Sequence, residues 1–207
     1  MSPVVIFDIG GVLVPEGTRM QQLLDHVAAL KGEFDREVFT DSYWAIRDEY
    51  DLGAADEQFW PPVFQRAGIE SDPTLVASAA AKDAELASTI AREPHQLLLE
   101  IADAGVPLGI LSNAPHRMAQ SVRESDWASV FAHLVFSSEH GLMKPDRAIY
   151  DLAASHFSDV EPSTIHFFDD RERNIVGAHA AGWHGHLWRS VDQARFELRS
   201  LGILTKR

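Results

Sequence analysis

The 207-residue chain contains no cysteine. Disulfide bridges, thiolate metal sites and cysteine nucleophiles are therefore excluded, and the composition favours a reducing compartment such as the cytoplasm. Proline and glycine number only 10 and 13, which is too few for a fibrous or disordered protein. No segment repeats at a fixed period, so repeat architectures are set aside. We therefore expect a globular protein, long enough for a full core and a smaller appendage.

Two further absences narrow the class of partner. No apolar run approaches the ~20 residues that a membrane-spanning helix needs, and the first residues carry no basic leader, so we expect a protein that is neither exported nor membrane-embedded. Positive charge is also scarce, because 18 Lys and Arg stand against 31 Asp and Glu, for a formal net charge of −13. Such a chain repels the backbone of nucleic acids. A small-molecule substrate is the better interpretation.

Short apolar segments recur along the chain and are typical of buried parallel strands. The predicted strands are residues 4–9, 107–111, 133–136, 164–168 and 183–188. Amphipathic stretches of helical length lie between and after them, at 94–104, 115–123, 146–157, 171–181 and 191–201. Because parallel strands need a crossover, usually a helix, this alternation predicts an α/β fold with a doubly wound parallel sheet. Ligands then bind at the carboxyl ends of the strands.

Residues 16–89 show helical periodicity throughout and carry 6 basic against 15 acidic residues, so most of the net negative charge of the chain lies there. We interpret this segment as an inserted α-helical domain. The predicted α/β core is then residues 1–15 together with 90–207. The insert contains Trp44, Trp60 and Phe64, which are interpreted as its own core rather than as the lining of a substrate pocket.

Polar residues follow four of the predicted strands. They are Asp8, the pair Ser112 and Asn113, Lys144, and the pair Asp169 and Asp170. In a parallel sheet these points lie along one edge, so residues distant in sequence converge. Carboxylates from separate strands repel one another unless a cation lies between them, and such oxygen-rich sites suit Mg²⁺. The hydroxyl, amide and ammonium groups, with a helix that begins near Pro115, suit a phosphoryl anion.

Four segments carry a family resemblance. They read FDIGGVL at 7–13, LSN at 111–113, GLMKPD at 141–146 and FDDRERN at 168–174. In this order and in these strand and loop contexts, they resemble the four motifs of the haloacid dehalogenase-like (HAD) hydrolase superfamily, in the subgroup with a helical cap inserted after the first strand. The resemblance implies a Rossmann-like core with a helical cap. Within the insert, YDLG at 50–53 followed by FW at 59–60 also resembles the cap of sugar-phosphate phosphatases in this group.

The resemblance implies that Asp8 is a nucleophile that attacks phosphorus and forms an aspartyl-phosphate. It also implies a Mg²⁺ ion held by the Asp8 carboxylate, the backbone carbonyl of Gly10 and the Asp169 carboxylate, with Asp170 supporting the site. The expected activity is a magnesium-dependent phosphohydrolase for a small phosphorylated metabolite.

The remaining motif residues are expected to bind the substrate. Lys144 would bridge the nucleophile and the phosphate, so it counts as both catalytic and substrate-binding. Ser112 and the backbone of Asn113 would bind the oxygens of the transferring group. The cap would close over the site and select the leaving group. No feature of the sequence identifies the substrate or the oligomeric state.

One position departs from the family pattern. Phosphatases of the family usually place a second Asp two residues after the nucleophile, where it protonates the leaving oxygen, and this chain has Gly10 there. The carbonyl that would bind the metal survives, but the proton donor is lost, and such groups contribute ~10²–10⁴-fold. Substrates with good leaving groups, such as anomeric sugar, acyl or aryl phosphates, would suffer least. Glu16 is a conceivable stand-in, although we interpret it as an exposed loop residue.

Two alternative functions stay open. A hydrolytic dehalogenase also uses the first-strand Asp, but it attacks carbon, needs no metal and has no use for the pair Asp169 and Asp170. A catalytically weakened member that binds a phosphorylated ligand or a protein is favoured by Gly10 and opposed by the other motifs. The spacing of His184 and His186 raises the idea of a second metal site, but with no third ligand nearby we interpret them as packed or sheet-surface residues.

Overall fold

The structure is a computed structural model that describes residues 3–158 and 160–205, apart from the side chain of Glu16. The suggestion that Glu16 replaces the missing acid therefore lies outside the described part. The described residues form a five-stranded sheet in the order β3-β2-β1-β4-β5, and all neighbouring strands are parallel. The strands are β1 (Val4–Phe7), β2 (Leu108–Ser112), β3 (His133–Phe136), β4 (Ile165–Asp169) and β5 (His184–Leu187). This is the predicted doubly wound sheet, with β1 at its centre.

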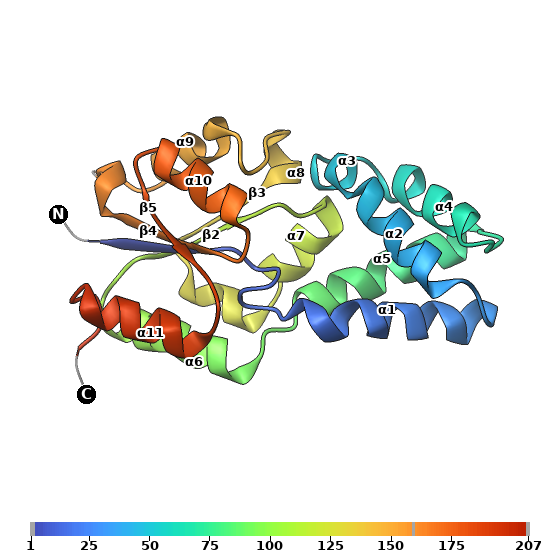
Figure 1. The fold of residues 1–207 in the computed structure, drawn as a ribbon, viewed down its shortest axis with the longest axis horizontal. Coiled ribbons are helices and arrows are strands. Elements are labelled where there is room, and N and C mark those ends of the chain that lie inside the picture. Colours follow the sequence, from blue (N-terminus) through green and yellow to red (C-terminus); the bar gives the residue numbers. More distant parts are fainter. Residues whose placement is uncertain (1–2, 159, 206–207) are drawn as a thin grey trace.

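Helices cover both faces of the sheet (Figure 1). The helices α6 (Arg92–Asp103), α7 (His116–Arg123) and α11 (Val191–Ser200) pack on one face, and α9 (Arg147–Ser155) and α10 (Glu172–Ala180) pack on the other. Side chains of β1 alternate between these layers: Val5 and Phe7 belong to the first core, and Val4 and Ile6 to the second. Because β1 is covered on both sides, all four of its residues are buried.

A second group of helices lies beyond the carboxyl ends of the strands (Figure 1). It comprises α1 (Glu16–Lys31), α2 (Arg36–Ala45), α3 (Arg47–Asp51), α4 (Asp56–Arg66) and α5 (Pro73–Ala87). These helices have a hydrophobic core of their own. Side-chain caps begin two of them, because Asp35 accepts from the Val38 N–H and Asp72 from the Leu75 N–H. The helical character of the insert agrees with the sequence pattern, while its division from the core at residues 16–89 stays a prediction.

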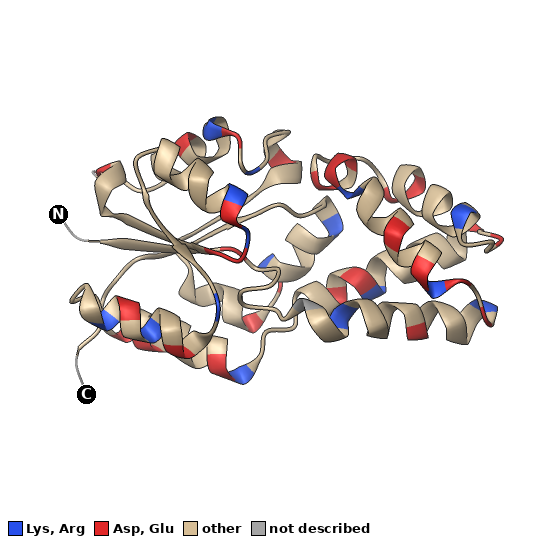
Figure 2. Ribbon diagram, viewed as in Figure 1, with Lys and Arg blue, Asp and Glu red and all other residues tan. Residues whose placement is uncertain are grey.

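The short helix α8 (Ser137–His140) follows β3, and 3₁₀ turns span Asp126–Val130 and Pro162–Thr164. Acidic residues are spread over both groups of helices, and Figure 2 also shows an acidic loop between β4 and α10 that faces the inserted helices. No helix among the described residues has the length and apolarity needed to cross a membrane.

The aromatic residues of the insert do not all behave as predicted. Trp60 and Phe64 are fully buried in the core of the insert, as expected. Trp44 is not, because its side chain remains 41% exposed and lines a pocket between the insert and the sheet. The interpretation of Trp44 as a core residue was wrong. Helical spacing does not distinguish a residue that faces the interior of a helical layer from one at the border of that layer.

The two histidines of β5 pack within the sheet region. The ring of His186 stacks on Phe168 with centroids 4.6 Å apart, and its Nε2 lies 3.0 Å from Nδ1 of His166. The ring of His184 stacks on the ring of His166, with centroids 5.0 Å apart. These ring contacts agree with the interpretation of His184 and His186 as packed or sheet-surface residues.

Candidate active site

A tight turn after β1 positions Asp8 and the two glycines. The Ile9 carbonyl accepts the N–H groups of three later residues, Val12, Leu13 and Val14. This turn needs Gly11, whose φ is +71° and whose hypothetical Cβ would lie 2.2 Å from Oδ2 of Asp170. The lack of space beside Asp170 therefore explains why position 11 is a glycine. It allows the β1 turn to approach the β4 turn and brings Asp8 towards Asp170.

Asp8 lies almost entirely out of solvent, with 7% of its surface exposed. Its Oδ1 lies 3.0 Å from Nζ of Lys144, but the atom is buried and no described residue gives it a well-aligned hydrogen bond. Burial raises the pKa of Asp8 to about 6, and the Asp169 carboxylate adds to this, while the Lys144 ammonium and the Ser112 hydroxyl lower it. Without a further cation, the negative charge of the Asp8 carboxylate is therefore only partly compensated.

Lys144 is a buried cation between two carboxylates. Only 1% of its surface is exposed, and Nζ lies 2.6 Å from Oδ2 of Asp169 in addition to its contact with Asp8. Burial alone lowers the pKa of Lys144, but the charges of Asp169 and Asp8 raise it above its ordinary value. The side chain is therefore a fixed positive charge next to Asp8, as the sequence predicted, and not a solvated loop lysine.

Asp169 is fully buried and well supplied with donors. Its Oδ1 accepts the Arg171 N–H at 2.9 Å and Nδ2 of Asn174 at 2.9 Å. Its Oδ2 accepts Nζ of Lys144 and, at 3.0 Å, the same Asn174 group. Sequence reasoning missed Asn174, which comes from the first turn of α10. A buried acid followed by a helix start was the available signal, since such acids need donors from that turn.

Three carboxylates converge at this edge of the sheet. Oxygens of Asp8, Asp169 and Asp170 lie within 4.8 Å of one another, and no other described group of three acidic or histidine residues is so arranged. The buried and unbonded Oδ1 of Asp8 fits a cation, as does the all-oxygen donor set, which suits Mg²⁺. The three carboxylates predicted for the metal site thus fit such an ion.

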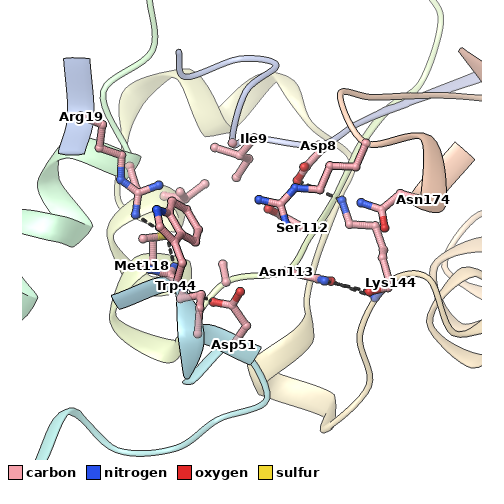
Figure 3. Close-up of a pocket in the computed structure, with 16 residues that line it drawn as sticks. Asp8, Ile9, Arg19, Trp44, Asp51, Ser112, Asn113, Met118, Lys144 and Asn174 are labelled. Carbon is pink, nitrogen blue, oxygen red and sulfur yellow. Dashed lines mark hydrogen bonds and ion pairs between the residues drawn. The ribbon is translucent and has the colours of Figure 1, made fainter. Parts of the chain in front are cut away.

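Ser112 and Asn113 lie at the end of β2, on the border of the same pocket. Ser112 is buried, and the structure places it near Asp8 (Figure 3). The Asn113 side chain has a different task from the one predicted for its backbone: Nδ2 donates to the Lys144 carbonyl at 3.0 Å, and Oδ1 accepts the Lys144 N–H at 2.9 Å. Asn113 therefore fixes the loop that carries Lys144. Helix α7 begins directly after Pro115, as expected.

The inserted helices supply the far end of the pocket. Asp8, Ser112, Lys144 and Asn174 lie on one side, and Arg19, Trp44, Asp51 and Met118 lie on the other (Figure 3). Arg47 also lines the pocket. Sequence reasoning did not identify the four insert residues Arg19, Trp44, Arg47 and Asp51 as pocket residues. They come from three helices, α1, α2 and α3, and only Asp51 stands in a segment whose resemblance to a family cap was noted from the sequence.

The fold and the site define a class of protein: a parallel α/β domain with a buried carboxylate directly after β1 and a helical insert beyond the carboxyl ends of the strands. A family model of haloacid dehalogenase-like hydrolases matches residues 3–182 of the chain. The chain therefore belongs to the haloacid dehalogenase-like hydrolases. No curated protein matches the sequence.

Several solved structures are similar in fold. A dehalogenase in an intermediate complex aligns with a TM-score of 0.72 and 19% identity over 100% of this chain and 98% of that one. L-2-haloacid dehalogenase from Xanthobacter autotrophicus, with chloropropionic acid covalently bound, aligns with a TM-score of 0.67 and 21% identity over 98% of this chain and 84% of that one. A HAD family enzyme from Bacteroides thetaiotaomicron, in complex with magnesium and inorganic phosphate, aligns with a TM-score of 0.66 and 16% identity over 91% of this chain and 95% of that one. At these identities the likeness shows the fold alone.

Proposed function

We propose that the protein is a magnesium-dependent phosphohydrolase that acts on a small phosphorylated metabolite through an aspartyl-phosphate on Asp8. The observation that carries this proposal is the convergence of Asp8, Asp169 and Asp170, whose oxygens lie within 4.8 Å of one another. Lys144 supplies a single positive charge to this group. Three buried or half-buried carboxylates and one ammonium leave an excess of negative charge, which a divalent cation would neutralise.

The hydrogen bonds of Asp169 give it a second task besides the metal. Asp169 accepts four hydrogen bonds from protein groups, among them those from Lys144 and Asn174. We assign Asp8, the Gly10 carbonyl and Asp169 as the metal-binding oxygens, with Asp170 supporting the site, and we assign Asp169 to holding Lys144 and Asn174 as well. Bound there, Mg²⁺ would offset the repulsion between an anionic nucleophile and an anionic substrate.

The chain's own groups account for the phosphoryl transfer. An Asp8 oxygen attacks phosphorus, a phosphorus–oxygen bond to Asp8 forms, and the bond to the leaving oxygen breaks. Lys144, Ser112 and the Asn113 backbone N–H would donate to the phosphoryl oxygens, which is positioning together with electrostatic stabilisation. Water then attacks the aspartyl-phosphate, which releases inorganic phosphate and restores the Asp8 carboxylate. Gly10 supplies no proton to the leaving oxygen, so that oxygen departs as an anion or takes its proton from water.

A dehalogenase is the second candidate, since two of the similar structures are dehalogenases. Such an enzyme attacks carbon with Asp8 and gains nothing from a metal. In that reaction the extra carboxylate of Asp170, directly beside the Gly11 turn, would only oppose the ionised nucleophile. The carboxylate group therefore favours the phosphohydrolase. The lack of cysteine supports a reducing, cytoplasmic setting for it.

Turnover with and without metal decides between the candidates. We expect purified protein to release phosphate from p-nitrophenyl phosphate and from an anomeric sugar phosphate in the presence of Mg²⁺, and to lose this activity with EDTA. Chloride release from 2-chloropropionate that persists in EDTA would instead establish a dehalogenase. Binding of phosphate esters with no turnover of either substrate class would identify a catalytically weakened binding protein.

A further inference from the structure

The far end of the pocket contains a buried charge network that the phosphoryl chemistry does not use. Asp83, 2% exposed, accepts hydrogen bonds from Nη2 of Arg19 at 2.7 Å and from the Tyr43 hydroxyl at 2.9 Å. Nη1 of Arg47 lies 3.4 Å from the same carboxylate. Nε of Arg47 donates to Oδ1 of Asp51 at 2.7 Å. Two arginines and two aspartates thus form one network with no net charge.

Apolar and aromatic surfaces surround this network. The guanidinium of Arg47 lies over the rings of Tyr43 and Tyr50, with centroid distances of 5.0 and 5.5 Å. On the pocket side, Trp44 and the Met118 side chain lie beside the charged groups (Figure 3). Because Arg47, Asp51 and Asp83 are buried, a leaving group with an unmatched charge would have a large desolvation cost beside them. A neutral leaving group avoids that cost.

Asp51 is the member of the network whose free carboxylate oxygen can accept a hydrogen bond from a ligand in the pocket. Among the described residues that line the pocket, it is the only carboxylate besides Asp8. Oδ1 is taken by Arg47, whereas no described residue donates a hydrogen bond to Oδ2. The backbone is held as well, because Oγ of Ser137 in α8 donates to the Asp51 carbonyl at 2.5 Å. Asp51 is therefore a fixed acceptor.

The position of Asp51 separates it from the bond that breaks. Figure 3 shows it at the opposite end of the pocket from Asp8, so it is not placed to protonate the leaving oxygen. Burial raises the pKa of the Asp51 carboxyl, although the Arg47 guanidinium opposes this effect. An ionised carboxylate in that setting is stabilised by any donor that a ligand brings.

We propose that Asp51 determines the specificity for the leaving group: it accepts a hydrogen bond from a hydroxyl of a small neutral leaving group, and its charge disfavours a leaving group that carries a second anion. The inference rests on the proposed phosphohydrolase function, since it places the phosphate at Asp8 and the rest of the ester at Asp51. It names a substrate class, the phosphate monoesters of small neutral hydroxylated compounds.

Two esters of equal length test the proposal by calorimetric titration in the presence of Mg²⁺. Glycerol 3-phosphate ends in a hydroxymethyl group, and 3-phosphoglycerate ends in a carboxylate. We expect the wild-type protein to bind the neutral ester at least about 10-fold more tightly. Asp51→Asn leaves Arg47 unbalanced, so we expect the ratio of the two dissociation constants to move by about 10-fold or more towards the anionic ester. A tenfold change corresponds to about 1.4 kcal/mol.

Asp56→Asn provides the matched control. Asp56 is in the same inserted group of helices and loses the same charge on substitution, but it pairs with Arg117 and Tyr50 outside the pocket. The ratio of the two dissociation constants in Asp56→Asn should therefore match that of the wild type. Asp51→Glu keeps the charge and should keep the preference for the neutral ester, which gives a second test if Asp51→Asn does not fold. Equal wild-type affinities, or an unchanged ratio in folded Asp51→Asn, would overturn the inference while the phosphohydrolase stands. No binding of either ester and no metal-dependent turnover would instead reject the proposed function.

Discussion

The side chain of Asn113 is bonded to both backbone polar groups of Lys144. Its Nδ2 donates to the Lys144 carbonyl at 3.0 Å, and its Oδ1 accepts the Lys144 N–H at 2.9 Å. The two residues are 31 positions apart; Asn113 directly follows β2, and Lys144 lies in the loop between α8 and α9. This pairing fixes the backbone from which the buried ammonium reaches Asp8 and Asp169. A residue predicted to act through its backbone is therefore also a support for the cation.

Asn113→Ala removes both hydrogen bonds. We expect a loss of about 1–3 kcal/mol in the free energy of unfolding, because the Lys144 backbone groups are left partly unsatisfied. Phosphatase activity should fall as well, since the ammonium is less well positioned. Urea denaturation and initial rates on p-nitrophenyl phosphate measure the two effects. Gln120→Ala, which removes an exposed contact with Glu124, is the control and should change neither. Full activity in Asn113→Ala would show that Lys144 does not depend on this clamp.

Asp8→Asn tests the nucleophile. We expect metal-dependent hydrolysis of an aryl phosphate to be abolished, because an amide is a poor nucleophile and a poor ligand for Mg²⁺. The fold should persist, since the Asp8 side chain makes few bonds to the protein and Lys144 keeps its contact with Asp169. Circular dichroism and thermal unfolding check the fold. Activity within a few-fold of the wild type in a folded variant would exclude Asp8 as the nucleophile.

The adjacent acids Asp169 and Asp170 should respond differently to the same substitution. Asp169→Asn removes the charge that faces the buried Lys144, so we expect it to cost about 3–5 kcal/mol of stability. Asp170→Asn should weaken Mg²⁺ binding and should cost less stability, because the charges that face the buried Lys144 are those of Asp169 and Asp8. Denaturant unfolding without metal and calorimetric titration with Mg²⁺ separate the two effects. Equal losses of stability in both variants would contradict the division of roles.

Histidine burial predicts an acid-sensitive fold. Burial lowers the pKa of His166 to about 4, and His186 and His184 add to this effect. The folded protein keeps His166 neutral, whereas the unfolded chain takes up the proton below its ordinary pKa of 6.5. Above pH 6.5 this titration does not reduce the free energy of unfolding. As the pH falls from 6.5 to about 4, the free energy of unfolding decreases by an amount on the order of 3 kcal/mol.

His166→Asn should flatten this pH dependence, and its own lower stability at pH 7.5 does not affect the comparison of slopes. Urea midpoints between pH 4.5 and 7.5 give the slope for each protein. His140→Asn changes an exposed histidine and serves as the control, which should retain the slope of the wild type. An unchanged slope in His166→Asn would assign the acid sensitivity to other groups.

Much of this architecture could be predicted from the sequence because it depends on local patterns. Apolar strand segments and amphipathic helices alternate, so a parallel sheet follows, and polar residues at the strand ends must then meet at one edge. This reasoning placed Asp8, Lys144 and Asp169 together, and the structure confirms that proximity. The end of β1 was set too late, because the apolar Ile9 continues the strand pattern but its carbonyl begins the turn.

The residues that the sequence did not reveal act through contacts between distant segments. Arg47 and Asp51 are four positions apart on α3, a spacing that predicts an ordinary surface ion pair. Their burial results from the packing of Tyr43, Tyr50 and Asp83 around them, which no short motif encodes. Trp44 follows the same helical period as its buried neighbours and nevertheless faces the pocket.

We expect Gly10 to affect how the enzyme handles its leaving group. The position two residues after the nucleophile carries no side chain, and the described carboxylates of the pocket are Asp8 and the distant Asp51. Among the described residues that line the pocket, no carboxylate besides the proposed nucleophile lies close enough to Asp8 to protonate the departing oxygen. The rate should therefore depend steeply on the pKa of the leaving group, with aryl and anomeric phosphates hydrolysed much faster than alkyl phosphates.

Gly10→Asp restores a carboxylate at this position. We expect it to raise the turnover of alkyl phosphates far more than that of aryl phosphates, by up to the ~10²–10⁴ that positioned proton transfer supplies. The backbone conformation permits a side chain here, because Gly11 rather than Gly10 has the positive φ of the turn. Gly11→Asp is the control and should disrupt the site, since even a Cβ would collide with Asp170. A folded Gly10→Asp variant with wild-type affinity for Mg²⁺ and an unchanged preference for aryl over alkyl esters would show that protonation of the leaving oxygen does not limit turnover.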